Sequence, residues 1–163
     1  MAPAPSTPSE LLRAELRRDG TRPLVTFYDD ATGERVELSV ITFENWVAKT
    51  AGLLQEGLSA EVGSRIGLAL PAHWQSLAWG AAGWAIGACV VAGPVDEFTD
   101  VDVAVAGPDT LDATRASGAH DVVALALRPL GGRFTTPLPD GVLDYAVEAP
   151  GYPDRFTPYD VPA

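Results

Sequence analysis

The residues best suited to bind a ligand are found in the run Pro71-Ala72-His73-Trp74-Gln75-Ser76. This run follows a short apolar stretch that predicts a buried strand, and it opens a segment of helical length. Open α/β sheets place ligands at the carboxyl ends of strands, and the first amides of a helix favour anions. The pattern therefore predicts a ligand-binding site made of His73, Trp74, Gln75 and Ser76. The alternative interpretation is structural: His73 and Ser76 cap the helix, and Trp74 packs in the domain or lies at the boundary of an interface.

The rest of the chain carries few groups with recognisable catalytic chemistry. No phosphate-binding G-x-x-x-x-G-K-[ST] loop, no G-x-G-x-x-G and no G-x-S-x-G elbow occurs. His73 and His120 are too far apart in the sequence to indicate a histidine metal site, so no metal or other cofactor is expected, although an acidic magnesium site stays open. Cys89 is the single cysteine and lies in an apolar stretch, which favours a thiol buried in the core.

Composition limits the class of protein. The chain has 163 residues, of which 47% are apolar, and its 11 basic and 22 acidic side chains give a net charge of −11. This predicts one domain with its own core and argues against binding to nucleic acid or to an anionic membrane surface. The uncharged run from His73 to Val95 has the length of a membrane span, but Pro94 and glycines interrupt it, so a buried unit is favoured. One cysteine and no signal peptide indicate a cytoplasmic protein.

The elements that must position the candidate site form a βαβ unit. We expect a strand at Arg65 to Leu70, a helix at His73 to Ile86 and a strand at Ala88 to Ala92, with the two strands parallel. Gly80 and Gly83 leave little side-chain bulk on the helix, which would let it lie close to the sheet.

Further elements flank this unit on both sides. Before it, the patterns predict a helix capped by Ser9 and ending near Gly20, a hairpin of strands Leu24 to Tyr28 and Glu34 to Val40 with a positive φ at Gly33, and a helix from an N-cap at Thr42 to about Glu56. After it, they predict a strand Val101 to Ala106, a helix begun by Gly107-Pro108 and ended by Gly118, a strand Asp121 to Leu127, and a short helix capped by Asp140 that carries Val142, Leu143, Ala146 and Val147.

The connection between the second and third strands of the expected sheet limits its topology. Residues Gly93 to Asp100 are too few for a crossover helix, so the strand after them must be antiparallel or lie elsewhere in the sheet. The predicted fold class is therefore α/β: a single layered domain with a mainly parallel sheet of about four strands, flanked by helices, plus an N-terminal β-hairpin. We divide the chain into a mobile leader (1–8), the α/β domain (9–149) and a tail rich in proline and aromatic residues (150–163).

The tail has two interpretations. It is either a terminus wrapped on its own domain or an aromatic arm that docks on a neighbouring subunit. The second interpretation predicts an interface made of Tyr152, Phe156 and Tyr159.

The order of these elements resembles the N-terminal subdomain of the adenylate-forming enzymes, the AMP-binding synthetases that make acyl-CoA or load carrier proteins. In that superfamily a Thr-Tyr-like pair opens a helix, and a strand ending in Pro, an apolar helix and a Gly-Ala strand ending near Pro follow. The matching residues here are Thr42-Phe43, Arg65 to Pro71, Leu77 to Gly87 and Gly87-Ala88 to Pro94. The resemblance covers roughly Leu24 to Leu127 and is greatest to short, truncated relatives that retain little but this subdomain.

Two departures from that superfamily decide what the resemblance implies. The helix that normally follows the Gly-Ala strand does not fit between Gly93 and Asp100, and the Ser/Thr/Gly-rich phosphate loop with its lysine is missing. The C-terminal domain with the catalytic lysine has no residues left to form it. We therefore expect an acyl-CoA synthetase-like protein without autonomous ligase activity, a non-catalytic binding or interaction module that forms a homodimer or binds a protein partner. The alternatives are an acyl-activating half-enzyme completed by a separate chain, and a binder of a small acyl, adenine nucleotide or CoA ligand.

Overall fold

The computed structural model describes residues 5–160, so the first four residues of the expected leader and the last three of the tail lie outside it. A five-stranded parallel sheet runs in the order β4-β3-β5-β6-β7, and β1 and β2 form a separate antiparallel pair. The strands are β1 (Pro23–Asp29), β2 (Glu34–Ser39), β3 (Arg65–Ala69), β4 (Cys89–Ala92), β5 (Val103–Ala106), β6 (Asp121–Ala124) and β7 (Val142–Asp144). The expected α/β class with an N-terminal hairpin is confirmed.

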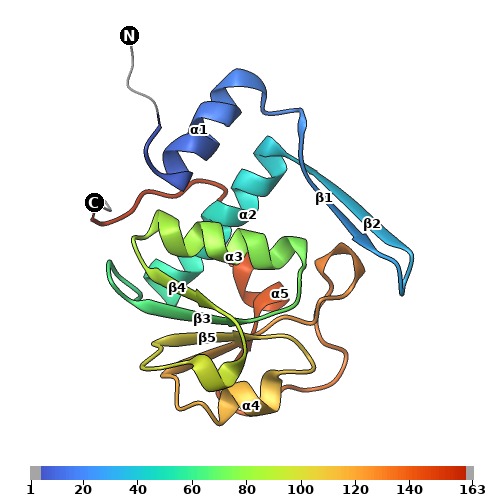
Figure 1. Ribbon diagram of the computed structural model, residues 1–163, viewed down its shortest axis with the longest axis vertical. Helices are drawn as coiled ribbons and strands as arrows, with labels where there is room; N and C mark the ends of the chain where they lie inside the picture. The colour runs from blue at the N-terminus through green and yellow to red at the C-terminus, as the bar shows by residue number, and fades with distance from the viewer. Residues whose placement is uncertain (1–4, 161–163) are drawn as a thin grey trace.

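Helices cover the sheet on both faces, as Figure 1 shows: α2 and α3 lie on one side and α4 on the other. The α-helices are α1 (Pro8–Asp19), α2 (Val40–Gly52), α3 (Trp74–Ala85), α4 (Leu111–Arg115) and α5 (Tyr145–Glu148). A π-helical turn, η1 (Leu53–Gly57), continues α2, and single 3₁₀ turns lie at η2 (Val95–Glu97), η3 (Pro129–Gly131) and η4 (Ala149–Gly151). Within residues 5–160, none of these helices combines the length and apolarity needed to cross a bilayer.

The central βαβ unit forms as predicted, with β3 and β4 paired in parallel and α3 between them. Gly83 is the position that lets α3 lie close to the sheet, because a Cβ there would be 2.6 Å from Cγ2 of Val90 on β4. Gly80 does not have this role, since a Cβ there would meet no atom within 4 Å.

The position of β5 resolves the two topologies left open by the sequence. It pairs in parallel with β3 on the side away from β4, so an antiparallel strand is wrong and placement elsewhere in the sheet is right. The connection crosses β3 with one 3₁₀ turn, η2, and its Phe98 ring covers Gly67, where a Cβ would lie 2.7 Å from the ring. The absence of a side chain on β3 at this point makes room for so short a crossing.

The last strand is a correction. A short helix capped by Asp140 was expected around Val142, but Val142–Asp144 forms β7, a fifth strand parallel to β6. The helix, α5, begins only at Tyr145, and its cap is Asp144, whose Oδ1 accepts a hydrogen bond from the Ala146 amide at 3.0 Å. The free edge of β6 supplies backbone partners that the local sequence pattern does not reveal, and they favour the strand.

Three helix starts also differ from expectation. The N-cap of α1 is Thr7, not Ser9, because Thr7 and Glu10 form a complete capping box. The N-cap of α2 is Ser39, not Thr42; the Thr42 amide donates to Ser39 Oγ at 3.2 Å. Pro108 does not start a helix, since α4 begins at Leu111, and Gly118 does not end it, since α4 ends at Arg115. Gly118 takes a positive φ in the turn that follows.

Cys89 is exposed, so the expectation of a buried core thiol is wrong. It is the first residue of β4, which lies at the edge of the sheet with a strand on one side only. The Arg65 guanidinium lies beside it, with Nη1 3.9 Å from the sulfur. An apolar run in the sequence does not distinguish an edge strand from a central one.

The core lies mainly between the sheet and the α2–α3 layer. Its largest fully buried side chains are Trp79 and Tyr145, whose rings are 5.4 Å apart. The Tyr145 hydroxyl is 2.7 Å from Thr50 Oγ1, which itself donates to the Trp46 carbonyl. Complete burial raises the pKa of Tyr145 far above its ordinary value, so the phenol stays protonated.

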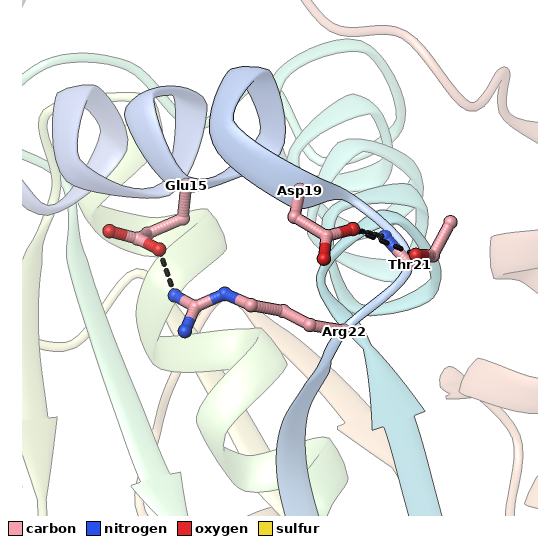
Figure 2. A network of polar contacts seen from close by, with 4 residues as sticks. All are labelled: Glu15, Asp19, Thr21 and Arg22. Carbon is pink, nitrogen blue, oxygen red and sulfur yellow. Dashed lines mark hydrogen bonds and ion pairs between the residues drawn. The ribbon is translucent and has the colours of Figure 1, made fainter.

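A short polar network fixes the joint between α1 and the hairpin (Figure 2). Asp19 Oδ1 accepts hydrogen bonds from the Thr21 amide at 3.0 Å and the Thr21 hydroxyl at 2.7 Å, and these bonds lower the pKa of Asp19. Arg22 forms an ion pair with Glu15 of α1. These contacts link the end of α1 to the segment that leads into β1.

The tail lies along its own domain. Lys49 of α2 donates to the Tyr152 carbonyl at 2.7 Å and pairs with Asp154 at 2.9 Å. Tyr152 and Phe156 pack against the core, which accounts for two of the three rings assigned to an interface. Tyr159 stays 75% exposed. Docking of these rings on a second subunit therefore remains a prediction, with Tyr159 the ring still free for it.

Candidate functional site

The four predicted site residues lie together at the carboxyl end of β3, where α3 begins. His73 is the N-cap of α3: its Nδ1 accepts a hydrogen bond from the Gln75 amide at 3.1 Å. The Ser76 hydroxyl donates to the Pro71 carbonyl at 2.8 Å. The structural interpretation is thus correct for the His73 cap, while Ser76 ties the helix to the end of the strand rather than capping it.

This junction also holds buried polar atoms without a partner. His73, Trp74 and Gln75 are 7%, 3% and 3% exposed. Among the residues that the structure describes, His73 Nε2, Trp74 Nε1 and Gln75 Oε1 are buried and make no hydrogen bond. Nearly all buried polar groups in folded proteins are paired, and an unpaired one costs about 1–3 kcal/mol. The three unpaired atoms lie on consecutive residues at the start of α3, and the described residues supply no hydrogen-bond partner for them.

A pocket of about 370 Å³ opens beside these residues. One wall comes from β1, the other from the start of α3; the lining residues are Val25, Thr26, Phe27, Tyr28, Ala72, His73, Trp74, Ser76 and Leu77. The His73 ring is held between aromatic neighbours, 4.6 Å from Phe27 and 5.7 Å from Trp74. The volume falls in the range of small-molecule sites, which start at roughly 300 Å³.

The β1 wall was missed by sequence reasoning. Phe27 and Tyr28 belong to a hairpin whose alternating pattern predicts a strand but not which helix the strand packs against. A loop was missed as well: Gly131 lies over Gln75 and Trp74, where a Cβ would be 3.6 Å from Gln75 Nε2 and 3.9 Å from Trp74 Cζ2. Nothing in the local sequence points to these partners, because each comes from a distant segment.

The adjacent end of the sheet is closed by its own hydrogen bonds. β3 and β5 flank the point where the strand order reverses, the usual ligand position in open α/β sheets. There the Thr110 hydroxyl donates to the Ala69 carbonyl at 2.7 Å and accepts from the Gly107 amide at 3.1 Å. The crevice between these two strands is therefore occupied, and the open space lies to one side, between α3 and the hairpin.

His73 is neutral near pH 7. Burial lowers the pKa of His73 below its ordinary value of 6.5, and the nearby Asp29 carboxylate only partly offsets this. Hydrogen bonds from Thr32 and Ala31 lower the pKa of Asp29 itself, so that carboxylate stays ionised. A neutral imidazole with Nδ1 engaged as an acceptor carries its proton on Nε2.

The depressed pKa predicts that stability falls on acidification. The unfolded chain protonates His73 near its ordinary value of 6.5, whereas the folded chain resists protonation. The part of the free energy of unfolding that depends on neutral His73 is therefore fully present above pH 6.5. It is lost as the pH falls below 6.5, by at most about 1.4 kcal/mol per pH unit. Urea unfolding at pH 7.5, 6.5 and 5.5 measures the loss, and His73→Asn, which keeps a capping oxygen, should lack it.

The exposed His120 serves as a control of opposite sign. Its hydrogen bond to Asp121 raises the pKa of His120, so the small stability that it adds is lost as the pH rises above 6.5. His120→Asn should leave the acid-dependent loss in place. Equal pH profiles for the parent chain and His73→Asn would contradict the assignment to His73.

A larger groove of about 890 Å³ lies at the opposite end of α3. Its walls come from the start of α1, the end of α3 and the tail, and its lining includes Glu10, Arg13, Trp84 and Phe156. No buried unpaired polar atom of the described residues belongs to a residue of this lining. Residues 5–160 hold no cluster of three potential metal-ligating side chains either. Of these two sites, only the pocket beside His73 is lined by residues that carry buried polar atoms without a hydrogen-bond partner.

Comparison with known proteins places the fold. No family model matches the sequence. Over 153 residues the chain is 43% identical to a "TIGR03089 family protein" of Mycobacterium tuberculosis (strain ATCC 25618 / H37Rv), an alignment that covers 91% of this chain and 61% of that protein. The chain thus spans about three fifths of the curated relative that it matches.

Solved structures of similar fold are acyl-CoA synthetases and a CoA ligase. The acetoacetyl-CoA synthetase from Streptomyces lividans matches with a TM-score of 0.78 and 18% identity over 96% of this chain and 26% of its own. The acyl-CoA synthetase of Brucella canis matches with a TM-score of 0.72 and 16% identity, over 90% of this chain and 28% of its own. The anthranilate CoA ligase AuaEII in complex with anthranoyl-AMP matches with a TM-score of 0.73 and 13% identity, over 95% of this chain and 30% of its own. The resemblance expected from the sequence is confirmed at the level of the fold, since most of this chain has the fold of about a quarter to a third of these enzymes.

Proposed function

We propose that this chain is a non-catalytic binding module with an acyl-CoA synthetase-like fold, and that by itself it forms no acyl adenylate. The observation that carries the proposal is the position of Lys49. Its ammonium group donates to the Tyr152 carbonyl and pairs with Asp154, so the one lysine of the chain holds the tail against α2.

Adenylate formation needs positive charge at the phosphates. A ligase that joins a carboxylate to AMP must stabilise negative charge on the phosphate oxygens as pyrophosphate leaves. A lysine already neutralised by a carboxylate is poorly suited to that task. The pocket beside His73 is lined by no arginine, lysine or acidic side chain. These features support binding rather than phosphoryl chemistry at this site.

Pyrophosphate exchange tests the proposal directly. The purified chain is incubated with ATP, magnesium, labelled pyrophosphate and a carboxylic acid, either acetoacetate or anthranilate, which two of the similar structures suggest. We expect that neither acid causes label to pass from pyrophosphate into ATP. An acyl-CoA synthetase serves as the positive control. Exchange that rises in proportion to the chain's concentration and disappears in Lys49→Met would overturn the proposal, because a contaminating enzyme would not respond to that substitution.

A half-enzyme is the second candidate, favoured by one observation. The Mycobacterium relative continues beyond the region that this chain matches, since the alignment covers 61% of it. If a separate segment supplies the missing groups, adding the unmatched part of that relative should create exchange that neither piece shows alone. No exchange from a mixture in which the two pieces co-elute by size exclusion would remove this candidate.

A further inference from the structure

We propose that the pocket between β1 and the start of α3 binds a small uncharged molecule with an apolar body and a carbonyl-type hydrogen-bond acceptor. This inference deepens the binding function proposed above and rests on it. It follows from three features of the pocket: which hydrogen-bonding groups are unpaired, what forms its walls, and which charges surround it.

The unpaired groups are mainly donors. The backbone amide of Gln75 donates a hydrogen bond to His73 Nδ1 at 3.1 Å, so the neutral ring carries its proton on Nε2. This N–H group is buried and has no partner among the described residues. Trp74 Nε1–H is also buried and unpartnered, and an indole can only donate. Both residues line the pocket, but the two N–H groups lie behind its wall, each with less than 1 Å² of accessible surface, so a ligand reaches them only if the wall side chains shift. A ligand that satisfies these two groups must therefore supply an acceptor oxygen or nitrogen.

The walls favour an apolar body. Most of the surface that lines the pocket is apolar, and Val25, Phe27, Tyr28, Ala72 and Leu77 belong to this lining. Tyr28 and Leu77 are 63% and 56% exposed and add apolar surface at the rim. A pocket of about 370 Å³ has room for a substituted ring or a short branched chain. An apolar body in this place would cover the exposed rim while its acceptor reaches inward.

The surrounding charges disfavour an ionised ligand. No charged side chain lines the pocket. The nearby Asp29 is ionised, and it would repel a carboxylate or phosphate that entered beside His73. Arg35, over the Tyr28 ring at 5.7 Å, is paired with Glu37 at 2.7 Å and provides no free positive charge. A cation would find two N–H donors and no acceptor on them. An uncharged acceptor fits these conditions best.

Three probe molecules of nearly equal shape test the inference: acetophenone, benzoate and 1-phenylethylammonium. They share a phenyl ring and carry a neutral carbonyl, a carboxylate and an ammonium group. Nitrogen-15 NMR at pH 7.5 follows His73 Nε2 and the Trp74 indole N–H, assigned with His73→Asn and Trp74→Phe. We expect acetophenone to shift both signals in a saturable manner, and the two charged probes to leave them in place.

Variants identify the donors. His73→Asn keeps an N-cap oxygen and loses the Nε2 donor, so acetophenone should bind about tenfold more weakly, the effect of one lost hydrogen bond. Trp74→Phe keeps an aromatic ring and removes the indole N–H, with a similar expected loss. His120→Asn, the same substitution on an exposed residue, should change nothing.

Each remaining outcome overturns a stated part of the inference. Unchanged signals up to the solubility of acetophenone remove the site. Binding of benzoate as tight as that of acetophenone removes the preference for an uncharged ligand. Equal affinities of the parent chain, His73→Asn and Trp74→Phe remove the two donors from the site. None of these results alters pyrophosphate exchange, so failure of this inference and failure of the proposed function are separate observations.

Discussion

Replacing Trp79 with alanine should destabilise the fold by about 3–5 kcal/mol, the usual range for a fully buried tryptophan. Trp79 has 0% exposure and packs on the Tyr145 ring, so its removal leaves a cavity where α3 meets α5. For a domain of this size we expect the melting temperature to fall by roughly 10 °C or more. Urea unfolding followed by circular dichroism measures the free energy of unfolding.

Trp84 provides a matched control for this substitution. It lies on the same helix, one turn and a half further on, but is 50% exposed. Trp84→Ala should cost less than about 1 kcal/mol, because little of its surface leaves water on folding. A similar loss of stability in both variants would show that α3 is not packed as described.

The two glycines of α3 should respond to alanine with opposite signs. Gly83→Ala places a methyl group 2.6 Å from Val90 Cγ2, a stiff β-branched side chain on β4, so we expect a loss of about 1–3 kcal/mol. Gly80→Ala meets no atom within 4 Å and gains helix propensity, so we expect a stabilisation of up to about 1 kcal/mol.

Thermal unfolding of the two variants in the same buffer compares these effects within one helix. Helix propensity alone predicts that both substitutions stabilise, so the difference between them reports the packing of α3 on β4. Adding Val90→Ala to Gly83→Ala should recover part of the loss by removing the methyl group that clashes. A stabilising Gly83→Ala variant would contradict the close approach of α3 to the sheet.

The parts of the fold that the sequence predicts are those held by local signals. The βαβ unit from Arg65 to Ala92 is one: an apolar strand ended by proline, a helix ended by Gly87 at φ 79°, and a second strand follow in short order. The hairpin is another, since Gly33 takes a positive φ of 74° between two alternating strands.

The parts that it does not predict depend on neighbours distant in the chain. Val142–Asp144 becomes a strand because the edge of β6 is free to pair with it, and Cys89 is exposed because its strand ends the sheet. The position of β5 depends on the Phe98 ring crossing Gly67, a contact between residues 31 positions apart. Local periodicity contains no information about any of these contacts.

The candidate site divides in the same way. His73 to Ser76 are contiguous and follow a strand, so their position at its carboxyl end can be predicted from the sequence. The tautomer of His73, its unpaired Nε2 and the wall contributed by Phe27 depend on packing between α3 and the hairpin. The chemistry of the pocket therefore becomes visible only in three dimensions.

Both ends of the described chain gather at one place, which matters for handling the protein. Thr7 and Pro8 share a groove with Thr157 and Pro158, beside the last residues of α3. Figure 1 shows the start of α1 and the tail side by side near that end of α3. The twelve-residue helix α3 is about 18 Å long, and the His73 pocket lies at its other end. Attachment to a sensor surface through either end should therefore leave the His73 pocket facing solution. A circularly permuted variant can also be made, in which a short peptide joins the two ends and the chain is opened in the Asp29–Gly33 turn. Acetophenone binding by this variant would show whether the hairpin must be continuous.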